Sequence, residues 1–288
     1  MLIYVGLYNN LSRNNSYTDT KATMKIPEIR RSKISRLVLE NRRQTIFQLS
    51  KTLDVSEETI RRDLNVLHSR GHVVKVHGGA VAPDTPGLGT YERRSIQQAD
   101  EKKRIALAAK KLFKPGATLM IDAGSTTGAF AEEMSKVEGM TIITNSLQVA
   151  RSFWQVGKGH TVILAGGELR LDTAETLGEV TLQQLGQFKV DHAVLTVGGI
   201  MATGEIMRYR IDEVMVARTM IDQAREITIL ADYTKMLTPA LMTICRIEQV
   251  TNLVTDRDPP PSLGKVLNDN GVRLIVADRH DLVSDGEI

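Results

Sequence analysis

The sequence predicts an α/β protein of two domains, a small helical N-terminal domain and a larger domain built on a parallel sheet. Its 288 residues are long for a single domain. The stretch "APDTPGLGT" is rich in proline, glycine and threonine and marks a boundary. After Thr118, short apolar segments alternate with helical ones. We therefore expect a tail over residues 1–25, a first domain over 26–81, a linker over 82–90 and a second domain over 91–288.

The composition is that of a soluble cytoplasmic protein. Hydrophobic residues make up 42% and charged residues 25%, and the apolar runs are shorter than a membrane-spanning helix, so no membrane partner is expected. The single cysteine, Cys245, excludes an intrachain disulfide and a multi-cysteine zinc site. The six histidines are scattered, and we predict no metal and no cofactor.

The first 23 residues differ from the rest of the chain. The segment "MLIYVGLY" is apolar but lacks the basic start and the small-residue cleavage site of a signal peptide. Two hypotheses remain open: translation begins at Met24, or residues 1–23 form a mobile tail. The intact mass of the protein expressed from its native gene would decide between them.

Positive charge is concentrated near the N-terminus. From Met24 to Val81 there are 12 Lys and Arg against 6 Asp and Glu, a net charge of +6, although the whole chain carries only +3. A basic module on a mildly acidic body favours a polyanionic partner. A charged surface that merely contacts solvent remains an equal alternative on charge alone.

Three helices are expected between residues 27 and 71. Pro27 fits the first turn of a helix that ends near Asn41, with Ile29, Ile34, Leu37 and Val38 on its apolar side, and "TIFQLSKTL" forms a second, short helix. After a tight connection, Ser56 is a strong N-cap for a third helix that Gly71 ends.

The third helix has one apolar face and one face with an arginine. Ile60, Leu64 and Leu67 recur at helical spacing, whereas Arg62 and Glu58 point away from them. An arginine near the N-terminal half of such a helix suits recognition of base edges in the major groove. The following residues 73–77 alternate like a strand, and Gly78-Gly79 give a sharp turn, which together predict a basic wing.

This pattern predicts a winged helix-turn-helix that binds DNA. The alternative is a three-helix bundle whose charges only keep it soluble. We predict DNA contacts from Ser56, Glu58, Thr59, Arg61, Arg62, Lys75 and His77.

The second domain is expected to begin with one long helix from Tyr91 to just before Pro115. Seven strands should follow, over residues 118–122, 140–145, 160–167, 191–199, 226–232, 250–256 and 272–278, with helices over 126–136, 147–156, 179–187, 211–224 and 262–270. This alternation predicts a parallel sheet covered on both faces.

Small and polar residues follow five of these strands, in "DAGSTTG", "TNS", "AGGE", "VGGI" and "ADYTK". Ligands bind at the carboxyl ends of such strands, and a helix that starts at Ser125 could receive a phosphate. The predicted effector-binding residues are Asp122, Gly124, Ser125, Thr126, Thr127, Thr144, Asn145, Gly166, Gly167, Gly198, Gly199 and Lys235. The alternative for each motif is a strand-to-helix turn that simply requires small residues.

The stretch "VSEETIRRDLNVLHSRGHVVKVHGGAV" closely resembles the winged helix-turn-helix of DeoR-type transcription regulators, with Lys75 where arginine is frequent. The stretches "EKKRIALAA", "LMIDAGSTT", "TIITNS", "VILAGGELR", "VGGI" and "LADYTK" resemble the sensor domain of the same family, so the resemblance covers about residues 26–278. It implies a repressor of a sugar or sugar-alcohol operon. It also implies a sensor similar in fold to ribose-5-phosphate isomerase, which binds phosphorylated metabolites.

We expect operator DNA and a phosphorylated sugar or sugar alcohol as partners, and a homodimer or homotetramer. Two other classes remain as alternatives. A sugar-phosphate isomerase would need a positioned acid–base pair, but only Glu205 lies near the strand end that corresponds to the carboxylate-rich isomerase loop. A nucleoid protein would bind DNA without sequence preference, and competition between operator and random DNA separates it from a regulator.

Overall fold

We analysed a computed structural model of the chain, which describes residues 27–69, 72–82 and 89–277. The predicted N-terminal tail, Gly71 and most of the predicted linker lie outside these residues. The chain divides after Ala82 into two compact units. Among the described residues, no helix has both the length and the apolar character needed to cross a bilayer.

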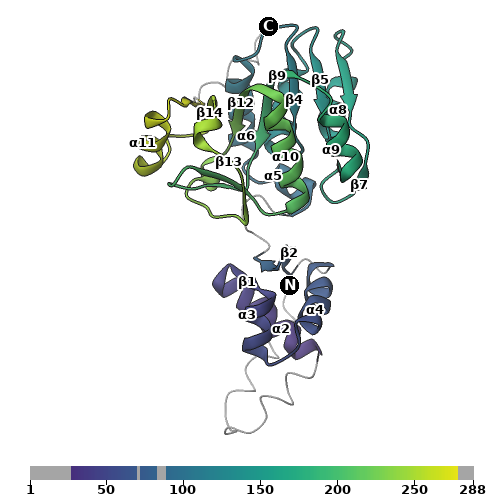
Figure 1. Cartoon of the computed structure of the whole chain (residues 1–288), viewed down its shortest axis with the longest axis vertical. Helices are drawn as coiled ribbons and strands as arrows, with labels where there is room; N and C mark the ends of the chain where they lie inside the picture. Colours follow the sequence, from purple (N-terminus) through teal and green to yellow (C-terminus); the bar gives the residue numbers. More distant parts are fainter. Residues whose placement is uncertain (1–26, 70–71, 83–88, 278–288) are drawn as a thin grey trace, which may run out of the picture. The chain divides into compact units, whose positions relative to one another are not determined.

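The first unit is a winged helix-turn-helix (Figure 1). Its elements are α2 (Pro27–Asn41), β1 (Arg43–Thr45), α3 (Ile46–Leu53), α4 (Glu57–Ser69), β2 (Val74–Val76) and β3 (Gly79–Val81). The strands form an antiparallel sheet in the order β1-β3-β2, so the wing has a third strand that the sequence pattern did not reveal. Gly78 makes the β2–β3 turn with φ +74°, a conformation that glycine adopts without strain.

The three helices of this unit enclose one apolar core, as predicted. Ile34 and Val38 of α2 pack with Leu49 of α3 and Leu64 of α4. The prediction for Ile29 was wrong, because its side chain is 42% exposed on the outer side of α2.

The second unit has a seven-stranded, fully parallel sheet, as predicted. Its strands are β4 (Thr118–Ile121), β5 (Thr141–Thr144), β6 (Thr161–Leu164), β9 (Val190–Thr196), β12 (Ala224–Leu230), β14 (Asn252–Thr255) and β15 (Arg273–Val276). They lie in the order β15-β14-β12-β9-β4-β5-β6.

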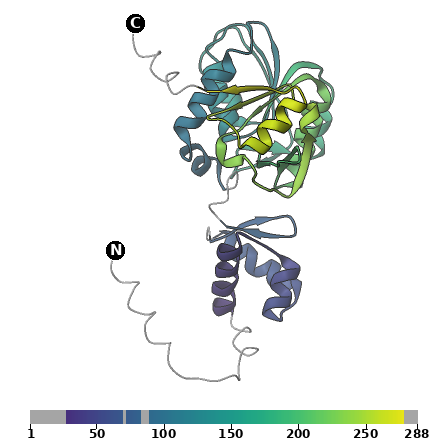
Figure 2. The same cartoon turned by 90° about the vertical axis from the view of Figure 1, so that its left-hand side faces the viewer.

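Helices cover both faces of the sheet. One core contains side chains of α6 (Ala99–Lys110), α7 (Ser125–Met134) and α8 (Leu147–Trp154), and the other those of α9 (Glu179–Leu185), α10 (Ile211–Gln223) and α11 (Pro261–Asp269). Successive strand residues alternate between the cores: Leu119 and Ile121 face the first, and Met120 faces the second. In Figure 2, α6 (blue) and α11 (yellow) lie on opposite sides of the sheet.

Three features of this unit differ from the sequence prediction or add to it. The expected long helix from Tyr91 is broken into α5 (Tyr91–Ile96) and α6, because Gln98 adopts a left-handed backbone (φ 53°). A small antiparallel sheet joins β10 (Gly199–Ile200), β11 (Glu205–Arg208) and β13 (Met242–Arg246). A hairpin joins β7 (Glu168–Arg170) and β8 (Glu175–Leu177).

The strand order reverses direction between β4 and β9. From β4 the chain proceeds outward through β5 to β6, whereas from β9 it proceeds the other way through β12 and β14 to β15. At such a switch point the connections diverge and leave a crevice at the carboxyl ends of the two strands, where ligands bind in open α/β sheets.

Candidate functional site

The outer face of α4 carries the arginines predicted to contact DNA. Ile60, Leu64 and Leu67 are buried, which confirms the predicted apolar face. On the other side, the Arg62 side chain is 78% exposed and that of Arg61 is 48% exposed. The helix is therefore held by its apolar side and presents two guanidinium groups to solvent.

Both arginines are paired within the helix. Arg61 Nη2 lies 2.8 Å from Glu57 Oε2, and Arg62 Nε lies 3.1 Å from Glu58 Oε1. Exposed pairs at this spacing contribute only about 0.3–0.5 kcal/mol. The guanidinium groups can therefore exchange these glutamates for phosphates or base edges at little cost.

The other predicted DNA contacts surround α4. Ser56 Oγ accepts a hydrogen bond from the Thr59 amide at 3.2 Å, which caps the first turn. Lys75 Nζ of the wing donates to Asn65 Oδ1 at 2.7 Å, and His77 is exposed beside the β2–β3 turn. The described residues thus bring all seven predicted side chains to α4, its cap and its wing.

Asp63 is a polar residue of this unit that sequence reasoning missed. It is 1% exposed, and its carboxylate accepts from Arg30 Nε at 2.5 Å and Arg31 Nε at 2.8 Å. The helical spacing of Asp63 from Ile60 and Leu67 places it on the buried face, which was the available signal. The cluster fixes α4 against α2 from inside.

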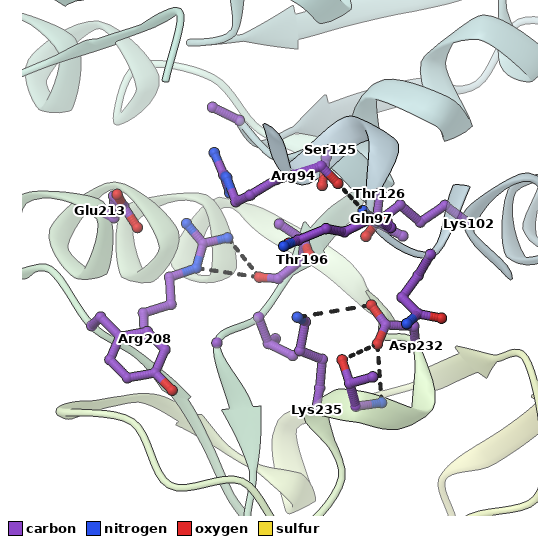
Figure 3. A pocket seen from close by; sticks show the side chains of 16 residues that line it. Arg94, Gln97, Lys102, Ser125, Thr126, Thr196, Arg208, Glu213, Asp232 and Lys235 are labelled. Atoms are coloured by element: carbon purple, nitrogen blue, oxygen red, sulfur yellow. Dashed lines mark hydrogen bonds and ion pairs between the residues drawn. The ribbon is translucent and has the colours of Figure 1, made fainter. Parts of the chain in front are cut away.

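The second unit contains a cavity of about 210 Å³ at the carboxyl ends of β4, β9 and β12, at the switch point (Figure 3). It is lined by Arg94, Gln97, Gln98, Lys102, Ala123, Ser125, Thr126, Thr196, Val197, Gly198, Arg208, Tyr209, Glu213, Asp232, Thr234 and Lys235. The side chains of Arg94, Lys102, Arg208 and Lys235 make its charge mainly cationic, against two lining carboxylates. Ser125 and Thr126 open α7, where the first N–H groups of a helix attract anions.

Arg208 is held in place from behind by Asp122. The Arg208 side chain is 5% exposed and forms an ion pair with the fully buried Asp122 carboxylate. Its Nη2 also donates to the Thr196 carbonyl at 2.6 Å, and the Thr196 amide donates to Asp122 Oδ2 at 3.0 Å. Asp122 therefore does not line the cavity but positions the arginine that does.

Burial shifts the pKa values of both lysines in the cavity. Burial lowers the pKa of Lys102 to about 8, and the nearby Asp232 carboxylate only partly offsets this effect. The pKa of Lys235 is also lowered by burial, although its ammonium lies 3.8 Å from Asp232 Oδ2. A bound anion would stabilise the charged form of each lysine and raise its pKa again.

Four of the predicted effector-binding residues line the cavity: Ser125, Thr126, Gly198 and Lys235. Three others lie beside it without lining it. Thr127 Oγ1 donates to the Asp122 carbonyl at 3.0 Å, a Cβ on Gly124 would stand 2.1 Å from Thr196 Cγ2, and a Cβ on Gly199 would stand 1.8 Å from the Thr238 carbonyl oxygen. These positions serve close packing around the cavity.

The strand ends of β5 and β6 are covered by the β7–β8 hairpin. Asn145 Nδ2 donates to the Thr176 carbonyl at 3.0 Å, and Thr144 Oγ1 donates to the Ile121 carbonyl at 2.6 Å. Gly166 N donates to Gln184 Oε1 at 2.7 Å, and a Cβ on Gly167 would stand 2.1 Å from Thr181 Oγ1. None of these four predicted residues lines the cavity.

Several lining residues were not among the predicted contacts. Arg94 and Lys102 lay inside the expected long helix, and Arg208 comes from a strand of the small antiparallel sheet, so no motif marked them. Asp232, in contrast, lies two residues after the end of β12 in "ADYTK", where the strand-end rule that selected Lys235 could also have selected it. Across the described residues, no group of three or more His, Cys, Asp or Glu side chains could hold a metal ion.

Comparison with known protein families finds two matches. The DeoR-like helix-turn-helix domain matches residues 30–86, and the DeoR C terminal sensor domain matches residues 97–257. The glycerol-3-phosphate regulon repressor of Escherichia coli (strain K12) is 34% identical over 79% of this chain and 90% of the relative. The HTH-type transcriptional repressor CsqR of the same strain is 33% identical over 86% and 94%.

A solved structure of D-ribose-5-phosphate isomerase in complex with phospho-erythronic acid aligns with 48% of this chain and 54% of the isomerase chain. The TM-score is 0.36 and the sequence identity 15%, a similarity too low to bear on function.

A winged helix-turn-helix with an exposed arginine face, joined in one chain to a separate unit with a polar cavity, defines a DNA-binding transcription regulator with a sensor domain. The chain belongs to the DeoR family of transcription regulators. Both of these relatives are named as repressors, which favours the regulator over the isomerase alternative.

Proposed function

We propose that this protein represses a sugar or sugar-alcohol catabolic operon and leaves its operator when a phosphorylated metabolite occupies the cavity. The observation that carries the proposal is the meeting of the α7 N-terminus with Arg94, Arg208 and Lys235 in one cavity at the switch point. Preorganised N–H donors and cations are what a phosphate ester requires. The cytoplasm, where operator DNA and such metabolites meet, is the expected location.

In this proposal α4 enters the major groove of the operator. Arg62, Thr59, Glu58 and Ser56 lie nearest the base edges, and Arg61, Lys75 and His77 contact the backbone. Sensor domains associate into a dimer or tetramer, which presents recognition helices at intervals of about 34 Å, one turn of DNA. The phosphorylated ligand need change operator affinity by only about 1–3 kcal/mol to act as a switch.

We further propose that the cavity binds its ligand without converting it. Of the two lining carboxylates, Asp232 accepts from the Thr234 amide at 3.0 Å and lies 3.8 Å from the Lys235 ammonium. Glu213 lies 3.5 Å from Arg210 Nε, so both carboxylates face cations of the protein. Glu205 is not among the lining residues. Turnover of ribose 5-phosphate by the pure protein above a control without protein would contradict this proposal.

The Arg62→Ala variant is expected to lose operator preference while the second unit stays folded. A bidentate arginine–guanine contact contributes about 1–3 kcal/mol of discrimination, so preference should fall roughly 10- to 100-fold. Arg61→Ala is the matched control. It should weaken the binding of all DNA sequences alike, and it should lower the salt dependence of the binding constant by the equivalent of about one phosphate contact. A footprint with unchanged preference in Arg62→Ala would refute the assigned role.

Ligand affinity should depend on pH through Lys102. Below its pKa of about 8 the ammonium is charged and can meet a phosphate. Above pH 8 the free protein must take up a proton on binding, so affinity should fall by up to about tenfold per pH unit. Isothermal titration between pH 7 and 9 measures this, and Lys102→Met should flatten the profile. If ligand affinity fell with pH as steeply in Lys102→Met as in the wild type, a group other than Lys102 would be responsible for the pH dependence.

The proposal is tested by thermal shift of the full chain with glycerol 3-phosphate, hexose, pentose and alditol phosphates and their unphosphorylated parents. Glycerol 3-phosphate comes first because a relative is named for its regulon. A ligand at 100 times its Kd stabilises the native state by about 2.7 kcal/mol. One ester should stabilise the second unit and its parent should not. Absence of any shift across the panel would contradict the ligand class.

A further inference from the structure

Helix α5 contributes Arg94 to the cavity wall and is, within the described part of the chain, the first helix after the DNA-binding unit. Arg94 and Gln97 extend from this segment toward the cavity (Figure 3). None of the residues of α5 is buried, and Ile96 is 78% exposed. The helix therefore lies on the surface of the second unit and contributes little to its core.

A few contacts hold α5 in place. The Tyr91 amide donates to the Asp172 carbonyl at 2.8 Å. The Tyr91 phenol lies against Gly128 of α7, so closely that a Cβ there would stand 2.3 Å from its oxygen. Lys102 Nζ donates to the carbonyls of Arg94 and Gln97 at the end of the helix. A segment held by so few contacts detaches at low cost compared with core elements.

On the cavity side of α5, one hydrogen-bond donor has no acceptor in the described part of the chain, and a ligand could supply it. Arg94 Nε is buried and has no hydrogen-bond partner among the described residues. An anion in the cavity would give this donor an acceptor and would also contact Gln97. Because those contacts exist only while α5 is docked, a ligand must shift the helix toward its docked position.

We propose that α5 acts as a strap: ligand binding holds it docked against the rest of the second unit. Docking of α5 in turn sets the length of chain between the two units. This inference rests on the proposed function. With α5 docked, residues 83–90 connect Ala82 to α5; with α5 detached, the connection extends to Gln98, before α6. A detached helix of six residues is too short to persist in water and unfolds. Full extension gives roughly 3.5 Å per residue, so detachment with unfolding doubles the maximum reach from about 28 Å to about 56 Å.

Through this change in reach, ligand binding can alter operator binding. Two recognition helices bind one operator together only when the connecting chains are long enough to reach both half-sites. When the chains are too short, the effective concentration of the second helix at its half-site approaches zero. Fastening α5 shortens both connections in an assembled regulator. Ligand binding therefore weakens operator binding without any contact between ligand and DNA-binding unit.

The Gly128→Ala variant tests the strap without altering a residue that lines the cavity. The added methyl group displaces the Tyr91 hydroxyl, while alanine favours the α7 helix more than glycine does. Tyr91→Phe is the matched partner: in the double variant the nearest ring atom, Cζ, stands 3.3 Å from the new Cβ, so docking should return.

Hydrogen exchange of the full-length variants, with inorganic phosphate as the probe, reads out docking. Phosphate should slow exchange over residues 90–98 in the wild type and leave α8 unchanged. In Gly128→Ala this segment should exchange faster. If its docked fraction falls to one tenth, phosphate affinity and phosphate-induced DNA release should weaken about tenfold. The double variant should restore all three properties.

Two results would overturn the proposal. If phosphate stabilises the protein but leaves hydrogen exchange over residues 90–98 unchanged, the strap proposal is wrong and the proposed function is unaffected. Equal ligand response in Gly128→Ala and wild type would lead to the same conclusion. If phosphate and its esters give no thermal shift in the wild type, the strap and the proposed function fail together.

Discussion

The Thr126→Glu variant is expected to bind DNA normally but to lose its response to phosphorylated ligands. Thr126 is 2% exposed and lines the cavity at the start of α7. A glutamate there places a negative charge where the ligand's phosphate belongs, and two such charges 4 Å apart repel by about 4 kcal/mol at an effective dielectric constant of 20. Ligand affinity should therefore fall by at least about 100-fold.

Isothermal titration and operator release measure this loss. Thr161→Glu, on the exposed start of the edge strand β6, is the control for an added charge and should respond like the wild type. Thermal melting confirms that the second unit of the Thr126→Glu variant is folded. A folded variant that still releases operator DNA at wild-type ligand concentrations would exclude the start of α7 as the phosphate site.

The Asp122→Ala variant is expected to destabilise the second unit by about 3–5 kcal/mol. It leaves the Arg208 guanidinium buried without its carboxylate, and breaking a buried ion pair in this way costs that much. Asp122→Asn should cost less, because its amide oxygen can still accept from the Thr196 amide.

Denaturant unfolding of both variants measures the difference. If Asp122→Ala lost less than about 1 kcal/mol, the ion pair would not position Arg208. If Asp122→Asn kept near-native stability but bound ligand more weakly, the result would support a positioning role for Asp122. Direct ligand contact is not required, since Asp122 does not line the cavity.

The sheet was predictable because its central strands carry apolar residues that pack into cores on both faces. Segments such as "TLMID" and "EITILAD" are short apolar runs with polar ends, and each became a parallel strand. The start of α7 was predictable for a related reason: small residues after a buried strand indicate a turn into a helix whose N–H groups are free.

The charged wall of the cavity was not predictable in the same way. Nothing in "RRSIQQADEK" marks a break, since neither glycine nor proline is present at Gln98. The left-handed turn there is closed by the Lys102 side chain, whose ammonium donates to the Gln97 carbonyl. Arg208 reaches the cavity through antiparallel pairing of β11 with β10 and β13, which depends on contacts distant in sequence. Helical and strand periodicity contain no information on either contact.

The most direct test of the central claim is operator binding by the full-length protein with and without a phosphate ester. A duplex selected from random DNA serves as operator, and fluorescence anisotropy at fixed salt measures its Kd beside that of a scrambled duplex. We predict preference for the selected duplex, lost on addition of one phosphate ester and kept with its unphosphorylated parent. Equal binding of both duplexes, or preference that no ester changes, would contradict a regulator controlled by a phosphorylated ligand.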